Sequence, residues 1–225
     1  VIKKITRAGS SSSRFRKVLV ISQFIISINL IIGSSVMFNQ LNFMKNKKLG
    51  FNKEHVVVIP IMDSSIRSKI ESIKNELKSY SSVISISSTS DVPGNNPDYS
   101  AFIPEGYTTE QTQLLHRINC DSDFIPTMGM ELVSGRNFSQ DFSTDAEEAT
   151  IINETAARTY GWDNPLGKKI GYFTNEEMNK LGYRTVIGLV KDFHVKSLHE
   201  KILPLLLTNN QDYLEEIAVR IRPEG

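Results

Sequence analysis

Cysteine is almost absent from this sequence, and so are the common signatures of nucleotide and acyl chemistry. Cys120 is the only cysteine, which excludes an internal disulfide and a multi-cysteine metal site. The chain contains no G-x-x-x-x-G-K-[ST] phosphate loop, no G-x-G-x-x-G after a predicted strand and no G-x-S-x-G elbow. These absences exclude ATP binding or hydrolysis by those routes, and they exclude a hydrolase built on a nucleophile elbow.

Acidic residues are absent from the first 48 positions. That segment holds nine of the 26 Lys and Arg residues, so the other 177 residues hold seventeen bases and all 25 acids. The formal net charge of +1 is therefore the sum of a basic segment at 1–48 and an acidic body at 49–225. Because the body is acidic and the basic residues flank an apolar run, the charge distribution does not favour a nucleic-acid partner.

The apolar run Val18–Phe38 has 21 residues and no charge. As a helix it would be about 32 Å long, which matches the ~30 Å hydrocarbon core of a bilayer. A cleaved signal peptide has a shorter apolar region of about 7–15 residues, and a buried helix of a soluble domain is rarely so uniformly apolar. We therefore interpret the run as a retained transmembrane helix.

Charge and length together predict the orientation. Six basic residues precede the apolar run and three follow it, and short basic flanks stay in the cytoplasm. Long downstream domains are translocated largely regardless of their charge. We expect a cytoplasmic segment at 1–17, a transmembrane helix at 18–40, a stalk extension at 41–50, where the helix would continue to about Leu49, and an extracytoplasmic domain at 51–225.

Small and hydrogen-bonding side chains follow one stripe of the predicted transmembrane helix. Gln23, Ser27 and Ser34 fall within about 40° of one another on a helical wheel. Such a stripe is typical of helix–helix packing in lipid, where close approach and hydrogen bonds replace the hydrophobic effect. The alternative is a lone anchor that tolerates a few polar residues.

Residues 51–225 show a mixed α+β pattern. Short β-branched or apolar runs predict strands at 55–61, 83–90, 112–120, 131–138, 149–152, 183–190, 204–209 and 215–222. Helical spacing predicts helices at 64–80, 121–130 and after Asn153, whose side chain would be the N-cap. The strand–helix–strand order at 55–90 indicates a βαβ-like or split unit, and 91–100 is expected to be a loop.

The lengths of the predicted elements in this domain suggest two lobes. Short elements separated by turns fill 119–182, whereas longer strands flank that segment. We therefore expect one lobe built from 51–118 and 183–225, which would follow the stalk, and an inserted lobe at 119–182.

The strongest candidate for metal chemistry is the sequence KDFHVKSLHE, which contains Asp192, His194, His199 and Glu200. Their spacing matches no established metal signature, and histidines in a polar connection are usually exposed or turn-capping. His55 and His116 stand alone in predicted strands. The sequence therefore predicts no catalytic, cofactor-binding or metal-binding residue.

Three segments in order carry a family resemblance: DFIPTMGMELVSGRNFSQD, ATIINETAARTYGWDNPLGKKI and YRTVIGLVKDFHVKSLHEKILPLLL. They resemble the extracytoplasmic core domain of MacB/FtsX-type ABC transporter permeases, and RKVLVISQFIISINLIIGS resembles the membrane helix that leads into it. The matching positions that we interpret as structural, not catalytic, are Gly135, Arg136, Asn153, Asn164, Pro165, Gly167, Gly188 and Asp192. Gly135, Gly167 and Pro165 are typical of tight turns.

The resemblance implies a permease of the inner membrane that forms a homodimer or pseudo-symmetric dimer. It also implies an ATP-binding cassette ATPase as a partner subunit and a peptide, lipoprotein or protein partner in the envelope. The outer domain would relay the ATPase cycle to that partner, with no cofactor of its own. A permease needs at least four spans, so we expect this chain to be a fragment. A ligand-sensing ectodomain of a membrane-anchored receptor is the alternative function, and a membrane-anchored envelope enzyme is a third.

Overall fold

The computed structural model describes residues 10–47, 49–95, 98–175, 180–196 and 200–223. The chain divides into two compact units, Val1–Lys48 and Leu49–Gly225. The first unit contains α1, and the second contains the strands and the short helices.

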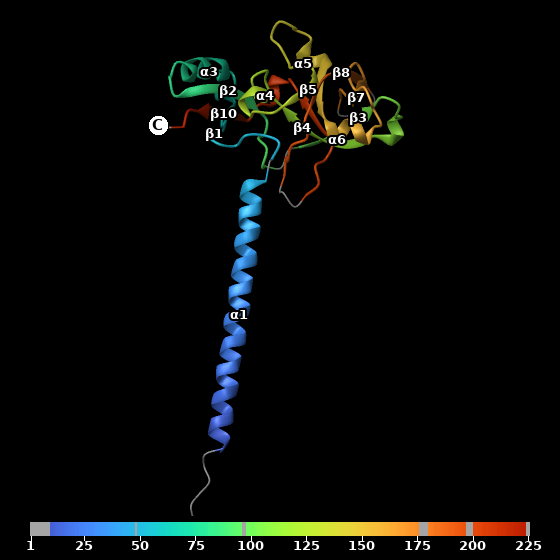
Figure 1. The fold of residues 1–225 in the computed structure, drawn as a ribbon. Coiled ribbons are helices and arrows are strands. Elements are labelled where there is room, and N and C mark those ends of the chain that lie inside the picture. The colour runs from blue at the N-terminus through green and yellow to red at the C-terminus, as the bar shows by residue number, and fades with distance from the viewer. Residues whose placement is uncertain (1–9, 48, 96–97, 176–179, 197–199, 224–225) are drawn as a thin grey trace, which may run out of the picture. The chain divides into compact units, whose positions relative to one another are not determined.

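Helix α1 (Ser10–Asn46) is one uninterrupted helix of 37 residues (Figure 1). Its section Arg14–Met44 is long and apolar enough to cross a membrane. Most of its large apolar side chains are exposed, which is costly in water and favourable in lipid. The described helix ends at Asn46, three residues before the predicted end near Leu49, and Lys48 lies outside the described residues.

A small antiparallel sheet begins and ends the second unit. Its order is β1 (Val56–Pro60), β10 (Glu216–Ile221) and β2 (Val83–Thr89), and both outer strands run antiparallel to β10. Strands β1 and β2 are therefore parallel with β10 between them, which is the split form of the predicted βαβ unit. Helices α2 (Ser64–Arg67) and α3 (Ile70–Lys78) connect them, and Ile73 and Leu77 of α3 pack on the core of this sheet.

The sequence predicts one helix at 64–80, but the structure breaks it between α2 and α3. The hydroxyl of Ser68 donates to the carbonyl oxygen of Ser65, and the peptide N–H of Ser68 bonds to Ile66 instead of continuing the helical pattern. Serine side chains that bond to the local backbone compete with helical hydrogen bonds.

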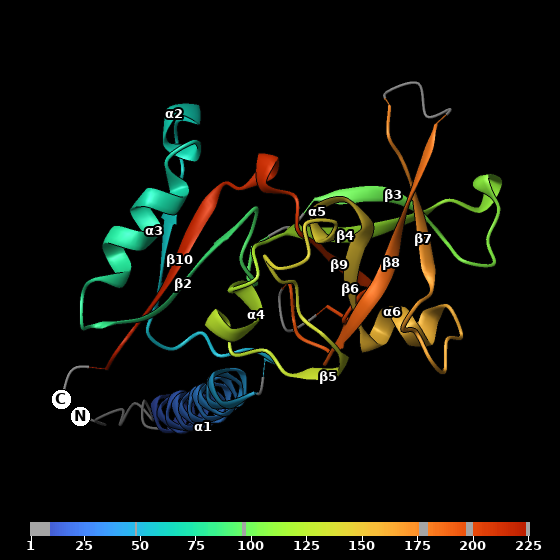
Figure 2. The same cartoon turned by 90° about the horizontal axis from the view of Figure 1, so that it is seen from above.

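The second sheet closes on itself. Its seven strands are β3 (Tyr99–Pro104), β4 (Gln113–Asn119), β5 (Leu132–Gly135), β6 (Ala149–Asn153), β7 (Lys169–Phe173), β8 (Leu181–Val190) and β9 (Leu205–Thr208). They follow the order β5-β8-β6-β9-β4-β3-β7, and β7 pairs again with β8. The first half of β8 pairs with β7 and its second half with β5, while β6 lies along its other edge. Six strands thus form a small barrel, which lies beside the three-stranded sheet (Figure 2).

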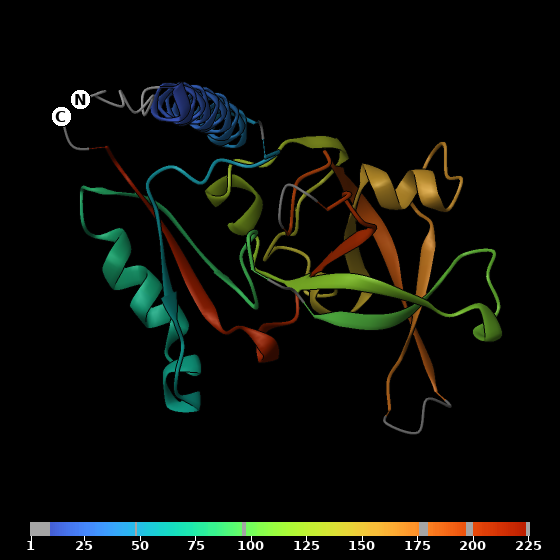
Figure 3. The same ribbon diagram turned by 90° about the horizontal axis from the view of Figure 1, so that it is seen from below.

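Besides the core of the three-stranded sheet, two further apolar clusters hold this unit together. Helix α6 (Glu154–Thr159) lies beside the barrel (Figure 3). One cluster fills the barrel near α6 and includes Leu115, Ile152 and Val186. The other joins the barrel to the three-stranded sheet through Phe124 of α4 (Phe124–Thr127) and Ala218 of β10. The remaining short elements are α5 (Asp145–Glu148), η1 (Thr109–Gln111) and η2 (Gln211–Tyr213).

The strand pairing differs from the predicted lobe boundaries. Strands β3, β4, β8 and β9, which the sequence assigned to the first lobe, pair with β5, β6 and β7 of the predicted inserted lobe. The barrel therefore takes residues 99–208, and the three-stranded sheet takes only the two flanking segments. Element length suggested the boundary at residue 119, whereas hydrogen bonding between distant strands decides it.

Candidate functional site at the junction after the apolar helix

The segment that follows α1 in the chain is fixed to the folded domain by backbone hydrogen bonds. The N–H of His194 donates to the carbonyl oxygen of Leu49 at 2.8 Å, and the N–H of Asn52 donates to that of Met128 at 2.8 Å. Further on, the N–H of Ile221 donates to the carbonyl oxygen of His55 at 2.9 Å. The incoming chain is therefore held by the end of β8, by α4 and by the outgoing end of β10.

Arg220 of β10 adds a side-chain anchor to the same segment. Its Nε donates to the carbonyl oxygen of Thr127 at 2.7 Å, Nη1 to that of Glu54 at 2.9 Å and Nη2 to that of Asn52 at 2.7 Å. A guanidinium carries its donors on three nitrogens in a rigid plane, so it can reach three separated carbonyls, whereas an ammonium group has all its donors on one nitrogen. The sequence reasoning missed Arg220, because nothing in its strand context indicates which distant carbonyls it reaches.

Gly50 allows the closest approach in this junction. Its φ is +83°, and a Cβ atom there would lie 2.4 Å from the carbonyl oxygen of Asp192 and 2.6 Å from the Cα of Phe193. Both facts require glycine. The backbone after the helix therefore packs directly on the backbone after β8.

Asp192 extends this contact toward α6. Its carboxylate accepts hydrogen bonds from the N–H and hydroxyl of Thr155 at 2.8 and 2.9 Å, and from Nη2 of Arg158 at 2.6 Å. Its own N–H donates to Glu154 at 3.1 Å. Asp192, one of the motif positions, thus links the end of β8 to the first turn of α6.

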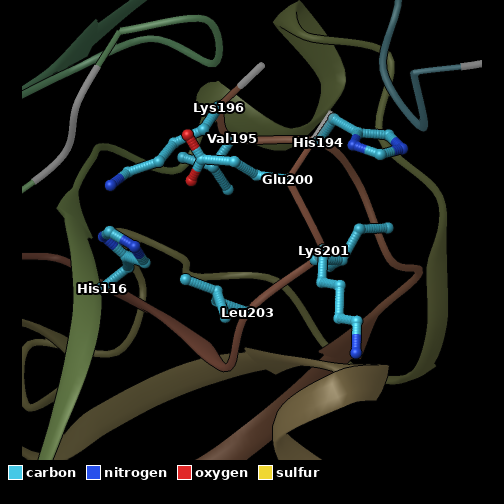
Figure 4. A pocket seen from close by; sticks show the side chains of 8 residues that line it. His116, His194, Val195, Lys196, Glu200, Lys201 and Leu203 are labelled. Carbon is cyan, nitrogen blue, oxygen red and sulfur yellow. The ribbon is translucent and has the colours of Figure 1, made fainter. Parts of the chain in front are cut away.

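The candidate metal residues do not converge on Asp192. The carboxylate of Asp192 is taken up by Thr155 and Arg158, and His199 lies outside the described residues. His194, Glu200 and His116 line a pocket that has room for about one water molecule, and the two imidazole rings lie on different sides of it (Figure 4). Within the described ranges, no group of three His, Cys, Asp or Glu side chains could hold a metal ion.

Gly135 and Gly188 face each other where β5 meets β8. A Cβ on Gly135 would lie 2.2 Å from the carbonyl oxygen of Ile187, and one on Gly188 would lie 2.5 Å from that of Arg136. The φ of Gly135 is also positive, at +78°. These two glycines allow β5 to pair with β8.

Arg136 follows directly and binds Asp145. Its two terminal nitrogens each lie 2.7 Å from a carboxylate oxygen of Asp145, whose side chain is buried, and its guanidinium stacks over Phe142 at 4.3 Å. Burial opposes ionisation of Asp145, but hydrogen bonds from Arg136 and from the N–H of Ser139, together with the charge of Arg136, outweigh it. The pKa of Asp145 is therefore lowered.

The other motif positions shape local turns. Asn153 is the N-cap of α6: its side chain accepts from the N–H of Ala156 at 3.0 Å, and its amide nitrogen donates to the carbonyl oxygen of Leu203 at 2.9 Å. Asn164 accepts from the N–H of Leu166. The N–H of Lys168 donates to the carbonyl oxygen of Pro165, and Gly167 in this turn has a φ of +82°.

The predicted motif residues thus form several separate structural sites. Asp192 alone belongs to the junction, while Gly135, Gly188 and Arg136 form the β5–β8 contact. Gln23, Ser27 and the rest of the predicted packing stripe lie on exposed positions of α1. That stripe stays a prediction, because the chain is described without a neighbouring helix.

Comparison of this chain with known proteins identifies its fold. No family model matches the sequence, and no curated protein matches it. Among solved structures, the periplasmic region of MacB from Actinobacillus actinomycetemcomitans superposes with a TM-score of 0.51 at 14% identity, over 78% of each chain. The extracellular domain of the noncanonic ABC-type transporter YknZ from Gram-positive bacteria gives a TM-score of 0.48 at 14% identity, over 75% of this chain and 84% of the other. This chain is therefore an N-terminal apolar helix followed by a mixed α/β domain with the fold of the periplasmic region of MacB.

Proposed function

We propose that this chain is the extracytoplasmic domain of an ABC transporter permease together with the transmembrane helix that precedes it. The fold shared with the periplasmic region of MacB and the apolar section Arg14–Met44 support this proposal. The N-terminus is cytoplasmic, and the domain lies outside the inner membrane. These 225 residues contain no phosphate loop, so in this proposal ATP is hydrolysed by an ATP-binding cassette ATPase, either separate or fused.

In this proposal the domain transmits motion and has no catalytic role. Two copies, or two related halves, surround the membrane path, and α1 carries the ATPase cycle to the outer domain. There the domain moves or regulates a peptide, lipoprotein or protein partner of the envelope.

The observation that carries the proposal is the way the chain is fixed directly after α1. Leu49, Gly50 and Asn52 are bound to segments at the end of β8 and α4, and Arg220 adds bonds from β10. A flexible tether would need none of these contacts. A displacement that reaches Leu49 passes to the barrel through β8 and to the three-stranded sheet through β10.

The test compares two insertions after Leu41 in the full permease with its ATPase subunit. Four alanines lengthen the helix by about 6 Å and turn it only about 40° beyond one full turn, so the helix stays stiff. Four glycines have the same length but each costs about 1 kcal/mol of helix stability relative to alanine. Hydrogen exchange of residues 49–54 and 192–194 is measured with and without trapped nucleotide.

We expect nucleotide-dependent exchange in the native permease and in the alanine variant, and its loss in the glycine variant. ATP hydrolysis should persist in all three proteins. If the glycine variant keeps the nucleotide-dependent change, α1 is a tether and the proposed relay is wrong.

A further inference from the structure

The interior of the barrel changes from apolar to polar along its axis. Side chains two residues apart on one strand face the same side of a sheet, so each strand contributes alternate residues to the interior. Near α6 these residues are Leu115, Ile152, Ile170, Val186 and Leu206. Two residues further from α6 on the same strands, the interior residues are Arg117, Thr150, Tyr172, Arg184 and Thr208. The second end is open: four of these residues line a cleft of about 930 Å³, together with Ser100, Asn119 and Tyr213.

Arg184 lies deep in this barrel mouth. Only 7% of the residue is exposed. Its Nη1 donates to the carbonyl oxygens of Ala146 and Ala149 at 3.0 and 3.1 Å, and the guanidinium lies 5.2 Å from the ring centre of Tyr172. Burial is the main reason that the pKa of Arg184 is lowered, and the charge of Arg117 contributes in the same direction.

Arg117 enters the same cleft from β4. Its Nε is buried and has no hydrogen-bond partner among the described residues, and its guanidinium lies 5.6 Å from the ring centre of Tyr213. In the part of the chain that the structure describes, neither Arg117 nor Arg184 forms an ion pair with a carboxylate. Buried or half-buried arginines usually have such a partner, because an unpaired charge is costly away from water.

The rim of the cleft indicates which anion fits. Glu147 and Asp212 line the cleft from exposed positions, whereas Arg184 is buried and Arg117 is half-buried. The exposed carboxylates would repel a doubly charged phosphate. A ligand with one carboxylate and basic groups beside it could bind the arginines through its acid and the exposed carboxylates through its basic groups. Planar guanidinium groups match the geometry of a carboxylate.

We propose that the barrel mouth binds a peptide segment through an acidic side chain, held by Arg117 and Arg184, with basic neighbours at the rim. The cleft volume lies within the range of ligand sites of about 300–1,000 Å³. Binding of a peptide by this chain does not require transmission through α1. The site can therefore be tested separately from the proposed relay.

The experiment uses the 225-residue chain in detergent micelles with ¹⁵N-labelled arginine, and it records the Nε–Hε signals of Arg117 and Arg184. Three amidated peptides are titrated at constant ionic strength: acetyl-GKEKG, acetyl-GKQKG and the same peptide with phosphoserine in place of the acid. We expect saturable shifts of both signals with acetyl-GKEKG, and at least tenfold weaker binding of the glutamine peptide and of the phosphoserine peptide.

The variant Arg117→Gln should weaken acetyl-GKEKG binding at least tenfold. The matched control is Arg222→Gln, which removes the same charge from an exposed position after β10 and should leave the affinity unchanged. Three outcomes would overturn the proposal: equal binding of the glutamine peptide, tighter binding of the phosphoserine peptide, or no saturable shift in the native chain. None of these three measurements uses a variant, so the proposal can be tested even if Arg117→Gln does not fold.

Discussion

Individual side chains in this domain satisfy charges that burial would otherwise make costly. Lys74 is almost fully buried, and its Nζ lies 2.7 Å from a carboxylate oxygen of Asp121, which also accepts from Ser87 and Ser88. Burial alone would lower the pKa of Lys74, but the charge and hydrogen bond of Asp121 raise it. This pair ties α3 to the segment before α4, whereas the guanidinium groups of the barrel mouth have no carboxylate partner among the residues that the structure describes.

The clearest prediction at the residue scale concerns Asp145→Asn. The exchange removes the negative charge that holds Arg136 and leaves a buried amide, so we expect a loss of roughly 1.5–3 kcal/mol in the free energy of unfolding at pH 7. Because the pKa of Asp145 is lower in the folded than in the unfolded state, its stabilisation is present above the unfolded value of about 3.9. It is lost as the pH falls through the folded value.

Urea unfolding of the chain in micelles at pH 7 and at pH 3 measures this prediction. The difference between native and Asp145→Asn should shrink at pH 3. Asp163→Asn, an exposed position, serves as control and should change stability by less than about 0.5 kcal/mol. An unchanged difference at both pH values would mean that the carboxylate charge does not contribute.

At the scale of elements, strands β8 and β10 organise the second unit through partners that are distant in sequence. Strand β8 pairs with β7 in its first half and with β5 in its second half, and this exchange closes the barrel. Strand β10 sits between β1 and β2 and carries Arg220 to the incoming chain. Each of these strands is placed by partners that are distant in sequence.

Gly188→Ala tests the β5–β8 contact. The added methyl group would lie 2.5 Å from the carbonyl oxygen of Arg136, a backbone atom that cannot move without separating β5 from β8. We expect a loss of roughly 1–3 kcal/mol, the usual cost of overpacking. Gly171→Ala in β7 is the matched control, because its nearest neighbour is a side-chain atom of Tyr183 at 3.3 Å.

Thermal unfolding followed by circular dichroism compares the two variants. Gly188→Ala should lower the melting temperature by several degrees more than Gly171→Ala does. Equal shifts would show that the close approach at Gly188 relaxes without cost.

For the whole molecule, the decisive feature is that the chain enters and leaves the folded domain at one place. Val56 at the start of β1 is the register partner of Arg220 near the end of β10. The barrel is the part of the chain inserted between these two adjacent segments. The barrel mouth and the junction are therefore separate regions of one folded unit.

The orientation of the molecule is tested by cysteine labelling in intact cells. Ser12→Cys lies before the apolar run, and Glu110→Cys lies on an exposed position of η1. The native Cys120 is buried, and burial raises the pKa of its thiol, so it should stay unlabelled. A membrane-impermeant maleimide should label Glu110→Cys and should reach Ser12→Cys only after the membrane is permeabilised; the reverse pattern would place the domain in the cytoplasm.

The sequence by itself determined the features that depend on neighbouring residues. The uncharged run at 18–38 indicated a helix long enough to cross a bilayer, and Asn153 before an amphipathic segment indicated an N-cap. Gly135 and Gly167 indicated turns with positive φ. Each of these signals arises from local sterics, local hydrogen bonds or the length of one element, so a window of the sequence contains it.

The tertiary structure alone decided how distant segments pair. Tyr99 and Ser100 were expected to end a loop and no strand was predicted at 101–104, because β3 gains its strand character from pairing with β4 and β7. The lobe boundary moved for the same reason. Arg220 at the junction and Arg117 with Arg184 in the barrel mouth became recognisable only when strands more than sixty residues apart came together. Closure of a sheet depends on hydrogen bonds between strands far apart in the chain, and no local pattern of residues records which strands those are.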